Sequence, residues 1–168
     1  MGQVEKTTTT TTIKGNNQET IKKILIAIDK SGYKEKIIRY GFTLAKALGA
    51  DVTAVHVIDR SSLGVAGDLF GFYRGGKIEV YEEALKKQAE ELLGEAEALA
   101  KKEGVKIKIE VITNSSSAAE GIIDYAENKN MDLIIIGTKG MTGIEKFLIG
   151  SVANKVTSHA HCSVLAVR

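Results

Sequence analysis

Glycines and a serine stand at conspicuous positions in the stretch 131–151 of this 168-residue sequence. Gly137 ends an apolar run, Gly140 follows three residues later, and the pair Gly150-Ser151 opens an expected helix. Glycines let the backbone approach an anion closely, and a helix N-terminus directs N–H groups and the positive end of its dipole outward. The pattern therefore indicates a loop that binds phosphate.

The alternative is that these glycines form only a turn and a helix cap. Two common nucleotide motifs are excluded, because no GK[ST] tripeptide completes a P-loop and the stretch 137–140 is spaced wrongly for GxGxxG. Lys139 and Thr142 lie in the same loop. They are candidates for phosphate contacts, although polar residues are also common in exposed loops without a ligand.

An acidic residue stands at a second strand end. The apolar run 24–28 predicts a strand that is buried on both faces, and Asp29 follows it directly. Beyond the carboxyl end of a parallel strand, a carboxylate can reach ribose hydroxyls or a metal ion between phosphate oxygens. The alternative is that Asp29 only caps the turn at 30–32.

Other chemically versatile residues give weaker patterns. His56 lies within an apolar strand pattern, which favours a hydrogen-bonded core histidine. His159, His161 and Cys162 fit no standard zinc spacing. The GxSxG motif of serine hydrolases is absent. Asp132 is interpreted as a surface residue of a turn.

Composition argues against several functional classes. The 23 basic and 21 acidic residues are interspersed and leave a net charge of +2, which does not favour a nucleic-acid surface. The single cysteine excludes an intrachain disulfide. No apolar segment is long enough to span a membrane, and no signal-peptide core is present. We therefore expect a cytoplasmic protein that binds neither nucleic acid nor membrane.

Apolar periodicity and glycine punctuation predict the elements that position these residues. Strands are expected at 24–28, 51–58, 105–112, 131–137 and 163–167. Helices are expected at 35–48, 78–103, 117–128 and 151–160. This alternation predicts an α/β fold, a doubly wound five-stranded parallel sheet with helices on both faces.

The same features predict the limits of the domain and the order of the strands. Residues 1–20, with six consecutive threonines, are expected to form a disordered arm, and residues 21–168 a single domain. The glycine-rich stretch 61–76 is interpreted as a functional or mobile loop. The alternating pattern of 105–112 suits an edge strand, which favours the strand order 3-2-1-4-5.

That strand order brings the two polar strand ends together. Asp29 and Gly137 would face each other across the crevice at the switch point, where ligands of such sheets bind. Backbone groups near Val57, at the end of the second strand, would be available to a base. The residue types at this crevice favour a nucleotide as ligand.

At these positions the sequence resembles the universal stress protein family. The spacing Gly137-x2-Gly140-x9-Gly150-Ser151 matches the family's ATP-binding signature. The segments KKILIAIDKS, VTAVHVID and HCSVLAVR are similar to its first, second and last strands. A proline that often precedes the family's last strand is absent, and Ser163 stands in its place.

The resemblance implies an ATP-binding protein of the stress response that holds Mg²⁺ or Mn²⁺ with the nucleotide. It implies that Asp29 contacts ribose or the metal ion, and that Val57 holds adenine through its backbone. The residues implied at the phosphates are Gly137, Gly140, Gly150, Ser151 and Val152, with Lys139 and Thr142 as further candidates.

The apolar stretch 163–167 raises the question of quaternary structure. It would form an outer strand, and an exposed apolar edge needs cover. Pairing with the same strand of a second copy would supply it, and the resemblance implies such homodimers. The leading hypothesis is a nucleotide-dependent regulatory switch with an unidentified protein partner. The alternatives are a weak or partner-stimulated ATP hydrolase, with Asp29 and Lys139 as its candidate groups, and a dimeric scaffold without nucleotide.

Overall fold

The computed structural model describes residues 20–59, 78–138 and 149–168. The expected disordered arm, the loop 61–76, and the loop residues Lys139, Gly140 and Thr142 lie outside these ranges. The elements are β1 (Lys23–Ala27), α1 (Lys34–Leu48), β2 (Asp51–Asp59), α3 (Ile78–Glu103), β3 (Ile107–Ser115), α4 (Ala118–Asn128), β4 (Leu133–Gly137), α5 (Ser151–His159) and β5 (Ser163–Val167).

The strands form one parallel sheet in the order β3-β2-β1-β4-β5, which confirms the predicted fold class and strand order. In the central strand β1, Ile26 pairs with Ala54 of β2 on one side and Ile135 of β4 on the other. Ile24, Leu25 and Ile26 are 0% exposed. Their continuous apolar run is therefore explained by burial on both faces of the sheet.

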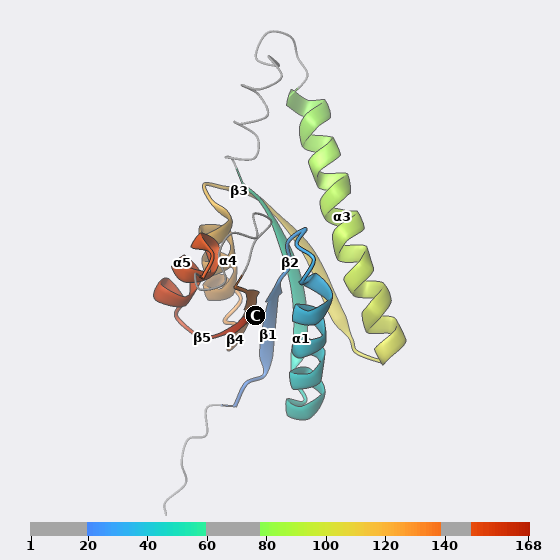
Figure 1. Cartoon of the computed structure of the whole chain (residues 1–168), viewed down its shortest axis with the longest axis vertical. Coiled ribbons are helices and arrows are strands. Elements are labelled where there is room, and N and C mark those ends of the chain that lie inside the picture. The colour runs from blue at the N-terminus through green and yellow to red at the C-terminus, as the bar shows by residue number, and fades with distance from the viewer. Residues whose placement is uncertain (1–19, 60–77, 139–148) are drawn as a thin grey trace, which may run out of the picture.

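Helices cover the two faces of the sheet in pairs (Figure 1). On one face α1 and α3 enclose a core cluster that includes Ile26 and Phe42. On the other face α4 and α5 enclose a second cluster, which includes Leu25 and Val156. Among the described helices, none combines the length and apolarity that are needed to cross a bilayer.

Several element boundaries differ from the prediction, and two of them affect the site. β1 ends at Ala27, one residue before the predicted end, so Asp29 lies two residues beyond the strand rather than directly after it. The N-cap of α5 is Gly150, and Ser151 is the first helical residue instead of a capping serine. Gly49 ends α1 as predicted, with the left-handed φ of 64° that favours glycine.

Two polar side chains fix connections near the site. The Ser117 hydroxyl accepts the Glu120 N–H at 3.3 Å and caps α4, as the capping-box spacing of Ser117 and Glu120 in the sequence predicts. The Asp132 carboxylate accepts the N–H groups of Lys22 and Lys23 at 2.7 and 2.8 Å. Asp132 thus lies in a turn, as the sequence predicts, and it also ties the start of β4 to the start of β1.

Candidate functional site

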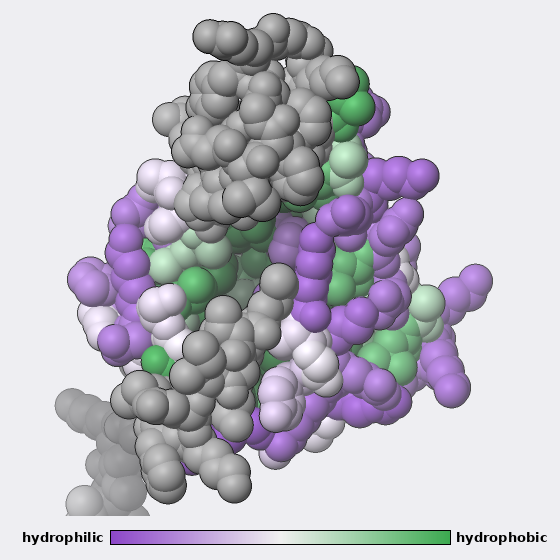
Figure 2. Space-filling view, turned by 45° about the horizontal axis from the view of Figure 1, so that its top comes forward, coloured by the Kyte–Doolittle hydropathy of each residue, from purple (hydrophilic) through white to green (hydrophobic). Residues whose placement is uncertain are grey.

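A pocket of about 190 Å³ lies at the carboxyl edge of the sheet, where β1 and β4 are neighbours. Figure 2 turns this edge toward the viewer and shows apolar surface in a hollow between hydrophilic flanks. The described residues that line the pocket are Ala27, Ile28, Asp29, Val55, His56, Val57, Ala118, Ile122, Ile136, Gly137, Gly150, Ser151, Val152 and Ala153.

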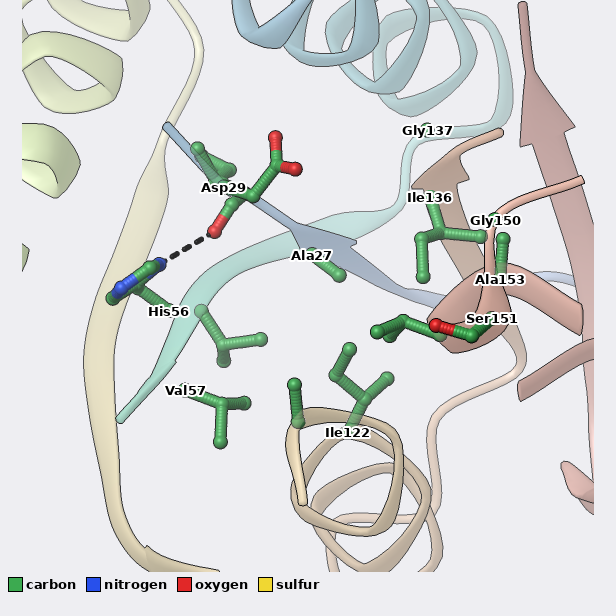
Figure 3. A pocket seen from close by; sticks show the side chains of 14 residues that line it. Ala27, Asp29, His56, Val57, Ile122, Ile136, Gly137, Gly150, Ser151 and Ala153 are labelled. Atoms are coloured by element: carbon green, nitrogen blue, oxygen red, sulfur yellow. Dashed lines mark hydrogen bonds between the residues drawn. The ribbon is translucent and has the colours of Figure 1, made fainter. Parts of the chain in front are cut away.

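The floor of the pocket is apolar. Ala27 and Ile136 lie at the ends of β1 and β4, and Val55 of β2 pairs with Ala27. Each of the three is at most 7% exposed. Ile122 of α4 closes the floor from the side, as Figure 3 shows. Such a surface accommodates the flat face of an apolar or aromatic group, because burial of its surface is favourable there.

The N-terminus of α5 supplies the polar side of the pocket. The first hydrogen bond within the helix runs from the Asn154 N–H to the Gly150 carbonyl at 2.9 Å. The N–H groups of Ser151, Val152 and Ala153 therefore have no acceptor within α5, and all three residues line the pocket. Three consecutive donors and the positive end of the helix dipole make this a place for an anion.

The Gly150 N–H is not one of these donors. It donates to the Thr138 carbonyl at 2.7 Å, and the Thr138 N–H donates to the Val167 carbonyl at 2.8 Å. These two bonds hold the end of β4 against both α5 and β5. The sequence prediction that Gly150 contacts the phosphates stays a prediction. The sequence did not single out Ala153, whose N–H has no acceptor within α5 and which also lines the pocket.

Asp29 lies beside the pocket at the end of β1 and is half-buried. Its Oδ1 accepts the Ser31 N–H at 3.1 Å, so the side chain does cap the following turn. In Figure 3 the carboxylate lies on one side of the strand ends, and Ile122 lies on the other. Capping uses one carboxylate oxygen in this bond, and the other remains available to a ligand.

The two residues at the end of β2 behave differently. Val57 is half-buried, and Figure 3 shows its side chain pointing toward α4. The Nδ1 atom of His56 lies 2.8 Å from the Ile28 carbonyl (Figure 3). Since a carbonyl can only accept, Nδ1 carries the proton. His56 is hydrogen-bonded as predicted, but it is half-buried and lines the pocket rather than lying in the core.

Side-chain charge in the pocket is sparse. Among the described lining residues there is no lysine or arginine, and Asp29 is the one carboxylate. A bound anion would therefore be held by backbone N–H groups, the helix dipole and any accompanying cation. Within the described ranges, no three His, Cys, Asp or Glu side chains lie close enough together to hold a metal ion without a ligand.

The sequence-predicted residues thus divide into two groups. Asp29, Val57, Gly137, Gly150, Ser151 and Val152 are brought together at one pocket. Lys139, Gly140 and Thr142 lie outside the described residues. The sequence did not predict the apolar floor or Ala153. The floor depends on the parallel pairing of strands that are distant in the sequence, and the place of Ala153 depends on the hydrogen bond between Gly150 and Thr138. Neither is a local sequence pattern.

Comparisons with known proteins agree with this arrangement. The family model described as the universal stress protein family matches residues 20–168. A universal stress protein of Methanocaldococcus jannaschii is 36% identical over 153 residues, which span 91% of this chain and 85% of that protein. The structure of hypothetical protein MJ0577, which served to assign its biochemical function, superposes with a TM-score of 0.73 at 25% identity, covering 88% of this chain and 96% of that one.

Two further solved structures share the fold and contain nucleotides. The universal stress protein from Archaeoglobus fulgidus in complex with dAMP has a TM-score of 0.63 at 23% identity, with 89% of this chain and 99% of that chain covered. A universal stress protein in complex with cAMP has a TM-score of 0.59 at 18% identity, with 88% and 96% covered. By the family match and the archaeal relative, this chain belongs to the universal stress protein family.

Proposed function

We propose that this chain binds an adenine nucleotide, with ATP as the ligand, in the pocket at the carboxyl edge of the sheet. The observation that carries the proposal is the row of N–H groups on Ser151, Val152 and Ala153, which lines the pocket beside Gly137. Phosphate oxygens are the acceptors that such a helix start suits best, because they bring both charge and several lone pairs.

The apolar floor suits the base. A planar purine would bury its faces against Ala27 and Val55 of the sheet and against Ile122 of α4. In the proposal, Val57 contacts the edge of the base through its backbone, since an apolar side chain offers no hydrogen bond. Recognition by backbone groups would favour adenine, which presents a donor and an acceptor side by side.

The carboxylate of Asp29 suits the ribose or a cation. Mg²⁺ prefers oxygen ligands and keeps several waters, and it is usually held by one or two carboxylates together with phosphate oxygens. One carboxylate beside an anion site is consistent with this coordination preference, and Mn²⁺ accepts the same oxygen ligands. In the proposal, Asp29 would help to hold Mg²⁺ or Mn²⁺ when the nucleotide is bound, and the cation would neutralise phosphate charge.

Structural neighbours support an adenine nucleotide in general. The ligands of two of them, dAMP and cAMP, share adenine and differ in the sugar and phosphate. In the present chain the three N–H groups at α5 and the loop signature favour a polyphosphate ligand over a single phosphate. ATP is therefore the ligand that we test first.

The output we propose is a nucleotide-dependent regulatory state of a homodimer in the stress response. β5 is the outer strand beside β4, and Val164, Leu165 and Ala166 are only half-buried. An apolar edge of this kind is a template for pairing with a second strand. Two copies joined through β5 would cover it with two-fold symmetry.

The proposal is tested by calorimetric titration of ATP with Mg²⁺ into the wild-type chain and the Asp29→Asn variant. The asparagine side chain would keep an acceptor for the Ser31 N–H and lose the charge, so the turn should survive. We expect saturable binding near one ATP per chain. The wild type should bind ATP more tightly with Mg²⁺ than with EDTA, and Asp29→Asn should lose this difference.

Two outcomes of the same titration would decide against it. Absence of binding to the wild type would contradict the nucleotide proposal and favour a dimeric scaffold. Rapid ADP production in the calorimeter cell would instead identify a hydrolase, since a binding protein should leave ATP intact over the titration. An unchanged Mg²⁺ effect in Asp29→Asn would exclude Asp29 as the metal-linked group.

A further inference from the structure

Helix α4 crosses the carboxyl ends of β2 and β3 at a residue without a side chain. Gly121 is buried, and a Cβ atom added to it would lie 2.8 Å from Cγ1 of Val57. The same Cβ would lie 3.1 Å from both Cβ and Oγ of Ser115. Carbon atoms in contact prefer about 3.5–4.0 Å, so α4 can lie this close only because residue 121 is glycine.

The atoms that face Gly121 have little freedom to move aside. Val57 is β-branched, and its χ1 angle is restricted on a strand. The Ser115 hydroxyl donates to the Ser117 carbonyl at 2.8 Å, in the turn that leads into α4. A methyl group at position 121 would therefore displace α4 or Val57 rather than be absorbed by a flexible side chain.

The same stretch of α4 forms one wall of the pocket. Ala118, three residues before Gly121, and Ile122, directly after it, both line the pocket, and Val57 lines it from the sheet. Figure 3 shows Val57 and Ile122 on facing elements. The distance between these two walls is thus set at the point where Gly121 meets Val57.

We propose that Gly121 is a positioning residue that sets the width of the base-binding end of the pocket. The inference rests on the proposed function, in which the base lies between α4 and the strand ends. A wider or tilted wall leaves a planar base with poorer contact on one face. The phosphate-binding N–H groups belong to α5, so Gly121 acts on recognition of the base and not on the phosphates.

The test compares Gly121→Ala with wild type in calorimetric titrations of ATP–Mg²⁺ and of inorganic triphosphate with Mg²⁺. Adding or removing one methylene in a binding pocket changes affinity by roughly 10–200-fold, and we expect a loss of at least about tenfold for ATP. We expect the triphosphate affinity to change less than about twofold, because its contacts lie at α5. A general loss of structure would lower both affinities together.

A matched control is Gly94→Ala on α3, where an added Cβ would meet no atom within 4 Å. This variant should bind ATP as wild type does. A second comparison is made between Val57→Ala alone and the double variant Val57→Ala, Gly121→Ala. Both proteins lack the Cγ1 atom that the new methyl group would meet. In that background the methyl should cost ATP affinity less than about threefold, the remainder being assigned to Ser115.

The outcomes separate this inference from the proposed function. If the wild type binds no ATP, the proposed function fails and the inference with it. If the wild type binds ATP and Gly121→Ala binds it equally well, or loses triphosphate affinity to the same extent, only the inference is overturned. If Gly121→Ala does not fold, the comparison of Val57→Ala with and without Gly121→Ala is the test. A tenfold loss of ATP affinity on adding Gly121→Ala to Val57→Ala would overturn the inference.

Discussion

The amide of Gly150 donates a 2.7 Å hydrogen bond to the carbonyl of Thr138, and this bond joins the start of α5 to the end of β4. The two residues flank the loop that carries the middle of the glycine signature. The bond fixes where the free donors of α5 begin. It also makes Gly150 a structural member of the site, whereas the N–H groups of Ser151, Val152 and Ala153 have no acceptor within α5.

Substitution of Gly150 by proline tests this role. Its φ of −56° is one that proline adopts, but proline has no N–H to donate to Thr138. We expect Gly150→Pro to lower the free energy of unfolding by about 1–3 kcal/mol, because the Thr138 carbonyl loses its partner. Gly150→Ala keeps the N–H at a permitted φ. In urea denaturation, equal stability of the two variants would contradict the structural role of this bond.

Two buried hydroxyls lie near the pocket, and removal of one of them should raise the stability, in contrast to the loss expected for Gly150→Pro. Thr138 and Ser31 are each 5% exposed, and within the described residues neither hydroxyl has a hydrogen-bond partner. Thr138→Val keeps the shape and removes the unpaired group, so the free energy of unfolding should rise by about 1 kcal/mol. Thr157→Val is the control, because its hydroxyl donates to the Ala153 carbonyl at 2.7 Å. A loss of stability in Thr138→Val would show that its hydroxyl is satisfied in solution.

Much of the fold was predictable because its signals are local. The apolar runs of β1 and β4 and the glycine after α1 each carry their information within a few residues. The site was predictable to the extent that a strand end, such as Asp29, or a helix start, such as Ser151, marks it. The role of Asp132 was missed, because its partners Lys22 and Lys23 are more than 100 residues away in the chain.

The role of Gly121 also depends on residues that are distant in the sequence, so it could not be predicted from local patterns. Its sequence neighbours predict a helix, and within a helix glycine is merely unfavourable. The reason for glycine at this position is the approach of Val57 and Ser115, which depends on how α4 lies across the sheet. Gly94 is the contrasting case. A glycine inside the expected helix 78–103 predicts a close contact from the sequence alone, and that prediction is wrong, because an added Cβ would meet no atom within 4 Å there.

A hydrogen bond between Tyr125 of α4 and Glu110 of β3 predicts that the stability of the protein depends on pH. The Tyr125 hydroxyl donates to Oε2 of Glu110 at 2.7 Å, and Nζ of Lys108 lies 2.9 Å from the same oxygen. The bond from Lys108, followed by that from Tyr125, lowers the pKa of Glu110 below its ordinary value of 4.5. Burial, followed by the bond to Glu110, raises the pKa of Tyr125 above its ordinary value of 10.0.

The sign of each shift fixes the pH window. The Glu110 contribution is present above pH 4.5 and is lost as the pH falls through its lowered pKa. The Tyr125 contribution is present below pH 10.0 and is lost as the pH rises toward its raised pKa. Tyr125→Phe should therefore destabilise between these limits, by at most about 1 kcal/mol because Glu110 is partly exposed to solvent.

The measurement is chemical denaturation of Tyr125→Phe and wild type at several pH values. The stability difference should narrow below pH 4.5 as Glu110 becomes protonated in both proteins. Tyr40→Phe is the control, since Tyr40 is 48% exposed on α1 and should show no such pH profile. A difference that stays constant down to about pH 2 would show that the carboxylate is not the acceptor.

The proposed homodimer predicts a specific effect of charge on β5. In a two-fold pairing centred on this strand, Leu165 faces its own copy, and like charges directly opposite each other are destabilising. Wild type should sediment as a dimer of 18.1-kDa chains at micromolar concentration, and Leu165→Lys as a monomer with unchanged helical circular dichroism. A monomeric wild type would contradict pairing through β5.

The central claim is that backbone N–H groups at the start of α5 hold the phosphates, and Ser151 allows a direct test. Gly150 has φ −56° and ψ 152°, the extended conformation that a residue before proline requires, and Ser151 is the first helical position, where proline is well accommodated. Ser151→Pro should therefore keep the helix and remove one N–H. Ser151→Ala removes only the hydroxyl and keeps that N–H.

Calorimetric titration of ATP with Mg²⁺ into both variants is the decisive measurement. A hydrogen bond to a charged group contributes roughly 1.5–3 kcal/mol, so Ser151→Pro should bind ATP about 10–100-fold more weakly than Ser151→Ala. Equal affinity of the folded proline and alanine variants would contradict the account, because the phosphates would then not rest on the first N–H group of α5.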